Sequence, residues 1–239
     1  MLKLYIGNKN YSSWSLRPWL AMRAAGIAFE EVRLRLDFTP GSPFKLALAE
    51  VAPNGKVPVL VDDEEKSAAE GRPLAVWETL AIAEYLAEKF PDRLPWPASR
   101  ADRARARSLC AEMHAGFGAL RANLPMNIEA SLPEVGAAHL RDRADVRADV
   151  ERITAMWSGQ LAVSGGPFLF GGFGLVDAYF APVCTRLRTY GVTLPEPAAA
   201  AYGERMLALP AMRDWEREAR AEADFLDFDE PYRSSRGND

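Results

Sequence analysis

The chain has 239 residues, of which 49% are hydrophobic and 26% charged, so it can fill one large core or two smaller ones. Its net charge of -4 argues against a surface built for phosphate backbones, and we expect no nucleic-acid partner. No stretch approaches the roughly 20 apolar residues that a membrane span needs. The first residues show no signal-peptide pattern, so we expect a cytoplasmic protein with no membrane partner.

Side chains that commonly bind metals are few and widely separated. Cys110 and Cys184 are the two cysteines, and His114 and His139 are the two histidines. Their spacing fits no zinc site. We therefore expect free thiols in a reducing compartment and no metal.

The first 90 residues alternate between strand and helix patterns. Strands are predicted over residues 2–6 and 29–36, and the helix between them is capped by Ser13 or Ser15, has Pro18 in its first turn and ends at Gly26. The remaining predicted elements are a short helix over 44–49, strands over 57–61 and 74–77 joined by a polar loop over 62–72, and a helix over 79–90. The predicted order is therefore β-α-β-α-β-β-α.

After residue 90 the strand patterns disappear. Residues 91–97 contain three prolines and no periodicity, which is typical of a linker. The helical patterns that follow are a long helix from before Leu109 to Leu120, and further helices over 143–162, 175–190, 198–208 and 212–223. We predict an α+β protein with one domain over 1–90, a linker over 91–99 and an all-helical domain over 100–239.

A proline begins the third predicted strand, at Val57-Pro58. Because proline cannot donate a ladder hydrogen bond, this position marks an edge or a special turn. A cis bond here would turn the N–H and C=O of Val57 outward, where they could hold an extended peptide. An ordinary trans proline at a sheet edge fits this segment equally well.

Glu78 and Thr79 stand immediately before and at the start of a predicted helix. The hydroxyl of Thr79 and the free N–H groups of the first turn suit a carboxylate, and the side chain of Glu78 suits an ammonium group. Together they would hold the α-amino-acid end of a ligand. The alternative is a simple helix cap by Thr79.

Three serine hydroxyls, from Ser12, Ser13 and Ser15, gather at the start of the first helix. A hydroxyl that donates to sulfur stabilises a thiolate, and lowering a thiol pKa by about 1.5 units requires roughly 2 kcal/mol. One charge-assisted hydrogen bond supplies this. Capping of the helix is the alternative, and we expect at least one of these serines to do only that.

In this order, the three motifs resemble the glutathione transferase superfamily. Residues 168–171 followed by 175–178 are similar to the signature of that family's C-terminal domain, so the resemblance covers essentially the whole chain. Gly174 stands where relatives usually place Ser or Thr, which leaves the capping box with Asp177 incomplete. The resemblance implies a thioredoxin-like N-terminal domain followed by an all-α helical bundle.

The resemblance also implies a binding site for glutathione as co-substrate. Val57 and a cis-Pro58 would pair with its cysteinyl backbone, while Glu78 and Thr79 would hold its γ-glutamyl end. Its glycyl carboxylate would meet a lysine. The residues implied at this site are Trp14, Lys45, Lys56, Val57, Pro58, Glu78 and Thr79.

Around the first helix the sequence is most similar to the zeta class, which has Ser-Ser-Cys at this point. Trp14 replaces that cysteine, which argues against maleylacetoacetate isomerase and against cysteine-based thiol transfer. The resemblance therefore implies a serine-type bacterial member, close to the zeta and theta-like enzymes. Ser13 stands four residues before Arg17, as the activating serine does in theta-like members, so we favour it over Ser12. Tyr11 is a weaker candidate.

The second substrate is expected between the domains, against Met113, His114 and Phe117. Core packing is the alternative for each of these residues. The implied function is detoxification, by conjugation of glutathione to a small apolar electrophile in a homodimer. Three alternatives remain open: glutathione-dependent isomerisation, peroxide reduction, and a non-catalytic glutathione-binding or regulatory module.

Overall fold

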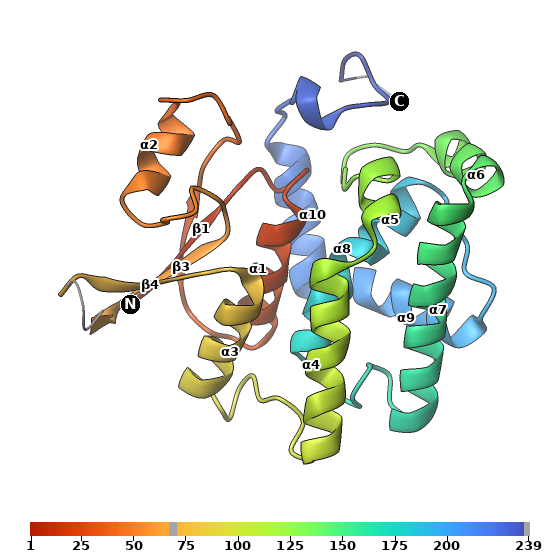
Figure 1. Cartoon of the computed structure of the whole chain (residues 1–239), viewed down its shortest axis with the longest axis horizontal. Helices are drawn as coiled ribbons and strands as arrows, with labels where there is room; N and C mark the ends of the chain where they lie inside the picture. Colours follow the sequence, from red (N-terminus) through yellow and green to blue (C-terminus); the bar gives the residue numbers. More distant parts are fainter. Residues whose placement is uncertain (67–70, 237–239) are drawn as a thin grey trace.

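The computed structural model describes residues 1–66 and 71–236 (Figure 1). Its strands form one mixed sheet whose spatial order is β2-β1-β3-β4. β2 runs parallel to β1, while β3 is antiparallel to both β1 and β4. The strands are β1 (Leu2–Ile6), β2 (Glu30–Arg33), β3 (Val59–Lys66) and β4 (Pro73–Trp77).

Helices cover both faces of this sheet. Alternate residues of β1 are buried and join the main core together with α1 (Ser13–Ala24) and α3 (Thr79–Lys89). The opposite face packs against α2 (Pro43–Ala49) in a smaller core that also contains Leu226, from near the end of the chain. This arrangement is the predicted thioredoxin-like unit.

From residue 100 onward, the described chain is mainly helical. α8 is buried along almost its whole length and packs against α1, α4 and α9, so one core joins the two parts of the molecule. The prediction of an α+β fold is confirmed. The helices are α4 (Arg100–Ala115), α5 (Gly118–Asn123), α6 (Pro133–Asp142), α7 (Ala144–Ser164), α8 (Leu175–Thr189), α9 (Pro197–Leu207) and α10 (Pro210–Ala221), followed by a 3-10 turn, η1 (Asp227–Asp229).

Four local predictions need correction. Pro18 is the sixth residue of α1 rather than part of its first turn, because the helix already begins at Ser13. The long helix predicted to reach Leu120 breaks at Phe117, whose φ of 60° is left-handed. β3 continues through Lys66, where a loop was predicted over 62–72, and residues 67–70 of that loop lie outside the described part. The predicted helices also omitted α6.

Cys110 and Cys184 are buried free thiols, as predicted. Burial raises the pKa of both, which keeps them protonated and chemically inert. Within residues 1–66 and 71–236, no helix has the length and apolar character needed to cross a membrane.

Candidate functional site

The start of α3 presents a carboxylate next to unpaired donors. Glu78 precedes the helix with φ 69°, a left-handed conformation that non-glycine residues rarely adopt and that concentrates at functional sites. Its carboxylate accepts a hydrogen bond from Asn54 Nδ2 at 3.3 Å. The first N–H groups of a helix have no acceptor within the helix, so they are available to an anion.

Thr79 does not cap α3, so the alternative of a simple cap is not observed. Its hydroxyl instead accepts a hydrogen bond of 2.6 Å from the hydroxyl of Tyr179 on α8. Burial raises the pKa of Tyr179, which therefore stays protonated and acts as the donor. The hydrogen of the Thr79 hydroxyl can consequently be donated to a ligand or to His114 Nδ1, which is 3.5 Å away.

The segment before β3 brings one of the two candidate lysines into a fixed position. The peptide bond between Val57 and Pro58 is cis, as predicted. Lys45 Nζ donates to the carbonyl of Gly55 at 3.1 Å, which holds the lysine against this segment. Lys56 is exposed, and its backbone N–H donates to Asn54 Oδ1 at 3.1 Å.

The three serines at the start of α1 have different partners. The hydroxyls of Ser12 and Ser15 bond to each other at 2.7 Å, and Ser15 also accepts the N–H of Gly7 at 3.1 Å. Ser13 Oγ instead accepts a hydrogen bond from Arg186 Nη2 at 3.3 Å. Because arginine can only donate, the hydrogen of the Ser13 hydroxyl remains available. Ser12 occupies the N-cap position without a side-chain cap, so the expectation that a serine caps α1 is wrong.

Arg17, Arg121 and Arg186 meet at the same corner, and we call them the guanidinium cluster. The Cζ atoms of Arg17 and Arg121 lie 4.2 Å and 4.6 Å from the centre of the Trp14 ring. Arg17 also lies 4.7 Å from the centre of the Tyr179 ring. Burial, reinforced by mutual repulsion, lowers the pKa of Arg17 to about 9 and that of Arg186 to about 10. All three groups therefore remain charged at neutral pH.

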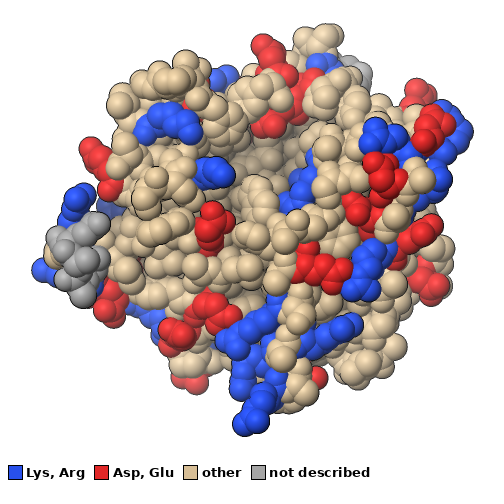
Figure 2. Space-filling view, viewed as in Figure 1, with Lys and Arg blue, Asp and Glu red and all other residues tan. Residues whose placement is uncertain are grey.

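His114 joins the two halves of this site. Its ring lies edge-on to Trp14 with centroids 5.1 Å apart, and its Nδ1 is 3.5 Å from the Thr79 hydroxyl. Burial and the nearby Arg17 lower its pKa, so the ring is neutral at pH 7. Figure 2 shows a hollow in the middle of this face, with lysine or arginine atoms visible on its wall.

The other two residues predicted to line the second-substrate pocket lie inside the protein. Met113 and Phe117 belong to the main core, with exposed fractions of 2% and 6%. His114 is the half-buried member of the predicted set. Of the three predicted residues, His114 is therefore the one exposed enough to contact a second substrate.

Sequence reasoning missed Tyr179, Arg121 and Arg186. Arg186 carried a detectable signal, because it stands in a helix whose neighbouring residues are mostly apolar. Arg121 carried none, since its position depends on the break at Phe117. After that break Arg121 Nε donates back to the carbonyl of Gly116 at 3.0 Å.

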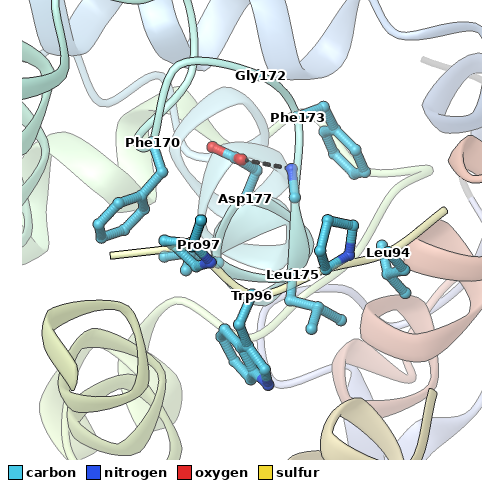
Figure 3. A pocket seen from close by; sticks show the side chains of 12 residues that line it. Leu94, Trp96, Pro97, Phe170, Gly172, Phe173, Leu175 and Asp177 are labelled. Atoms are coloured by element: carbon cyan, nitrogen blue, oxygen red, sulfur yellow. Dashed lines mark hydrogen bonds between the residues drawn. The ribbon is translucent and has the colours of Figure 1, made fainter. Parts of the chain in front are cut away.

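A separate pocket of about 290 Å³ lies between residues 94–98 and the start of α8 (Figure 3). Its lining includes Leu94, Trp96 and Phe173, and it contains none of the predicted site residues. Asp177 stands at its edge and accepts the N–H of Gly174 at 2.8 Å. This contact is the half of the capping box that Gly174 permits.

Comparison with known proteins agrees with this geometry. The family model for the glutathione S-transferase N-terminal domain matches residues 11–89. The glutathione S-transferase GstB of Escherichia coli K12 is 29% identical over 208 residues, which cover 86% of this chain and 93% of GstB.

Two solved structures share the fold. A glutathione transferase homologue from Burkholderia, with bound glutathione, superposes with a TM-score of 0.63 at 22% identity, covering 92% of this chain and 98% of that one. Maleylacetoacetate isomerase from Anaeromyxobacter dehalogenans gives 0.63 at 23% identity, with 95% of each chain covered. Residues 11–89 therefore match the glutathione S-transferase N-terminal domain, and the chain as a whole shares the fold of the glutathione transferases.

Proposed function

We propose that this protein binds glutathione as a co-substrate and transfers its thiolate to a small electrophile, with Ser13 as the activating residue. The Ser13 hydroxyl carries this proposal. It is held by Arg186 at the N-terminus of α1, and its own hydrogen is free to be donated to sulfur. Ser12 is the weaker candidate because its hydroxyl is paired with that of Ser15.

The three parts of glutathione match three features of the site. The γ-glutamyl ammonium would meet the carboxylate of Glu78, and the neighbouring carboxylate would accept from the Thr79 hydroxyl and the first N–H groups of α3. The backbone of Val57 would pair with the cysteinyl residue as an added strand does. Lys45 is the better placed partner for the glycyl carboxylate, with the exposed Lys56 as the second candidate.

The same corner favours the thiolate over the thiol. A free thiol has a pKa of about 8.5, so only a small fraction is ionised at neutral pH. The hydrogen bond from Ser13, the N-terminus of α1 and the positive charge of Arg186 all stabilise the anion. The thiolate sulfur then forms a bond to the electrophilic carbon, and the leaving group departs with the electron pair of the bond that breaks.

Two measurements test this proposal. Calorimetric titration should show one saturable glutathione site per chain, and steady-state assays on a panel of electrophiles should show conjugation. Isomerisation or peroxide reduction uses the same thiolate and would be detected in assays of those reactions. Saturable binding without turnover in any assay would favour the non-catalytic module. The absence of saturable glutathione binding would reject the proposal.

We further propose that two chains form a symmetric dimer in the cytoplasm, with α3 of one chain near α4 of the other. The face concerned carries an exposed ion pair between Arg107 and Glu84, with Nε and Oε1 2.6 Å apart. Arg103 lies on the same helix and donates to the carbonyls of Pro97 and Ala98. Sedimentation at micromolar concentration should give a dimer, and a monomer would contradict this proposal.

A further inference from the structure

The guanidinium cluster carries more positive charge than a thiolate balances. Within the described residues, none of Arg17, Arg121 and Arg186 forms an ion pair with a carboxylate. Asp149 acts electrostatically on Arg121, and Asp229 acts on Arg186, both from beyond ion-pair distance. A single glutathione thiolate at Ser13 would add one negative charge, which leaves the cluster positive.

Hydrogen-bonding capacity in the cluster is also unused. Nε and Nη1 of Arg17 and Nη1 of Arg186 are buried without a partner among the described residues. Arg17 is 2% exposed and Arg186 is 6% exposed. A buried charge without a counter-charge destabilises a folded protein, and such costs concentrate at functional sites. The unpaired N–H groups therefore point to an anionic ligand.

The cluster has a partly exposed side. Trp14, Arg121 and His114 are half-buried, whereas Arg17 and Arg186 are buried. Arg121 is fixed by the carbonyls at the end of α4, to which both its Nε and Nη2 donate. This anchoring keeps its charge beside Trp14 without a carboxylate partner.

We propose that the electrophile conjugated at this site carries a carboxylate, which binds the guanidinium cluster next to the sulfur of glutathione. The inference rests on the proposed function and replaces the apolar electrophile expected from the sequence. Arg121 and Arg186 bind the carboxylate, and the charge of Arg17 strengthens the positive potential of the pocket through its position against Trp14. Guanidinium groups recognise carboxylates through their planar array of donors.

Two product analogues that differ only in charge test this inference. S-carboxymethylglutathione places a carboxylate one carbon from the sulfur, and S-carbamoylmethylglutathione places a neutral amide there. Because hydrogen bonds to charged groups are strong, calorimetry should show at least about ten-fold tighter binding of the carboxylate. In Arg17→Met and Arg121→Gln that preference should fall to about three-fold or less, while affinity for glutathione itself changes little.

Arg152→Met is the matched control, because Arg152 is exposed, pairs with Glu112 and lies outside the cluster. Its preference for the carboxylate should equal that of the parent protein. Arg17→Met should unfold at the same temperature as the parent or higher, since methionine replaces a buried guanidinium that has no carboxylate partner among the described residues. This result separates loss of the anion site from loss of the fold.

The outcomes are distinguishable. Equal affinity for the two analogues in the parent protein would overturn the anion site while leaving glutathione binding intact. An undiminished preference in both arginine variants would also overturn it. If neither the analogues nor glutathione binds, the proposed function fails as well. A carboxylate preference that disappears only in the cluster variants is the result we predict.

Discussion

The Thr79 hydroxyl makes a contact within the fold and is also the proposed donor to the ligand. It accepts from the buried Tyr179, so its own hydrogen remains for a ligand or for His114 Nδ1. Tyr179 in turn lies against Arg17, so the proposed glutamyl and sulfur ends of the site share one set of contacts. The pair also connects the thioredoxin-like unit to α8.

Thr79→Val should weaken glutathione binding about ten-fold to a hundred-fold, because a hydrogen bond to a carboxylate is lost. It should also lower the free energy of unfolding by about 1–3 kcal/mol, since the buried hydroxyl of Tyr179 loses its partner. Calorimetry and urea denaturation measure the two effects. Thr79→Ser keeps the hydroxyl and serves as the control. Unchanged glutathione affinity in Thr79→Val would place the γ-glutamyl site elsewhere.

The sequence predicts site residues that are neighbours in the chain, and it misses those that only the fold brings together. Glu78 and Thr79 are neighbours at a helix start, so their joint use can be predicted from the chain alone. Arg186 reaches Ser13 only because α8 packs against α1, across 173 positions of sequence. No local pattern encodes that contact.

The incomplete capping box of Gly174 and Asp177 raises the question of what stabilises the start of α8. Asp177 accepts from the backbone N–H groups of Gly174 and Leu169 and from the hydroxyl of Tyr202, at 2.8, 3.1 and 3.0 Å. Burial raises its pKa to about 6, although these donors oppose the shift. One carboxylate thus fixes the turn before α8 to its first turn, and Gly174 contributes no side chain to the cap.

Gly174→Ser should therefore stabilise the protein by about 0.5 kcal/mol, by completing the cap and by reducing the freedom of the unfolded chain. Gly174 has φ -151°, which any residue adopts, and an added Cβ would meet no atom closer than Asp177 Oδ2 at 4.0 Å. Urea denaturation measures the gain. Gly174→Ala, which adds a Cβ without a hydroxyl, is the control. A loss of stability in Gly174→Ser would show that the cap cannot form here.

Most elements were predictable because their patterns are local, and the misses have specific causes. The break after α4 places Phe117 in a left-handed conformation. Bulky residues rarely adopt this conformation, so the sequence does not predict the break. The outer half of β3 is acidic and exposed, so it shows no alternation of apolar residues that would identify a strand.

Glu230, close to the C-terminus, connects segments that are far apart in the sequence. Glu230 is buried and accepts from Tyr11 at 2.7 Å, from Asn127 at 2.9 Å and from Arg233 Nε at 2.8 Å. Tyr11 lies just before α1, so this contact joins the segment after η1 to the start of the helix that contains Ser13 and Ser15. Tyr11 was a weak candidate thiol partner, and its hydroxyl is occupied by Glu230.

The lowered pKa of Glu230 leads us to predict that stability depends on pH. Burial would raise its pKa, but hydrogen bonds from Arg233 and Tyr11 outweigh burial and hold the pKa below its usual 4.5. A carboxyl whose pKa is depressed by folding stabilises the protein above its unfolded pKa and loses that contribution as pH falls through the folded pKa. Stability should therefore decline with acid below about pH 4.5.

Glu230→Gln should lower the free energy of unfolding at pH 7 by about 3 kcal/mol, because it leaves Arg233 without its buried partner. The decline in stability below pH 4.5 should become shallower in the variant than in the parent. Urea denaturation across this pH range measures both. Glu129→Gln, which removes a more exposed carboxylate near Arg233, is the control and should cost less. Parallel pH profiles for Glu230→Gln and the parent would contradict this assignment.

The pKa of glutathione bound to the parent and to Ser13→Ala, followed by thiolate absorbance, tests the central claim most directly. We predict a rise of about one unit in Ser13→Ala, equivalent to about 1.4 kcal/mol, with affinity for glutathione nearly unchanged because its other contacts remain. Conjugation should slow most at low pH, where the thiolate is scarcest. Ser12→Ala, the control, should leave the pKa in place. A thiol pKa in Ser13→Ala equal to that in the parent would contradict activation by Ser13.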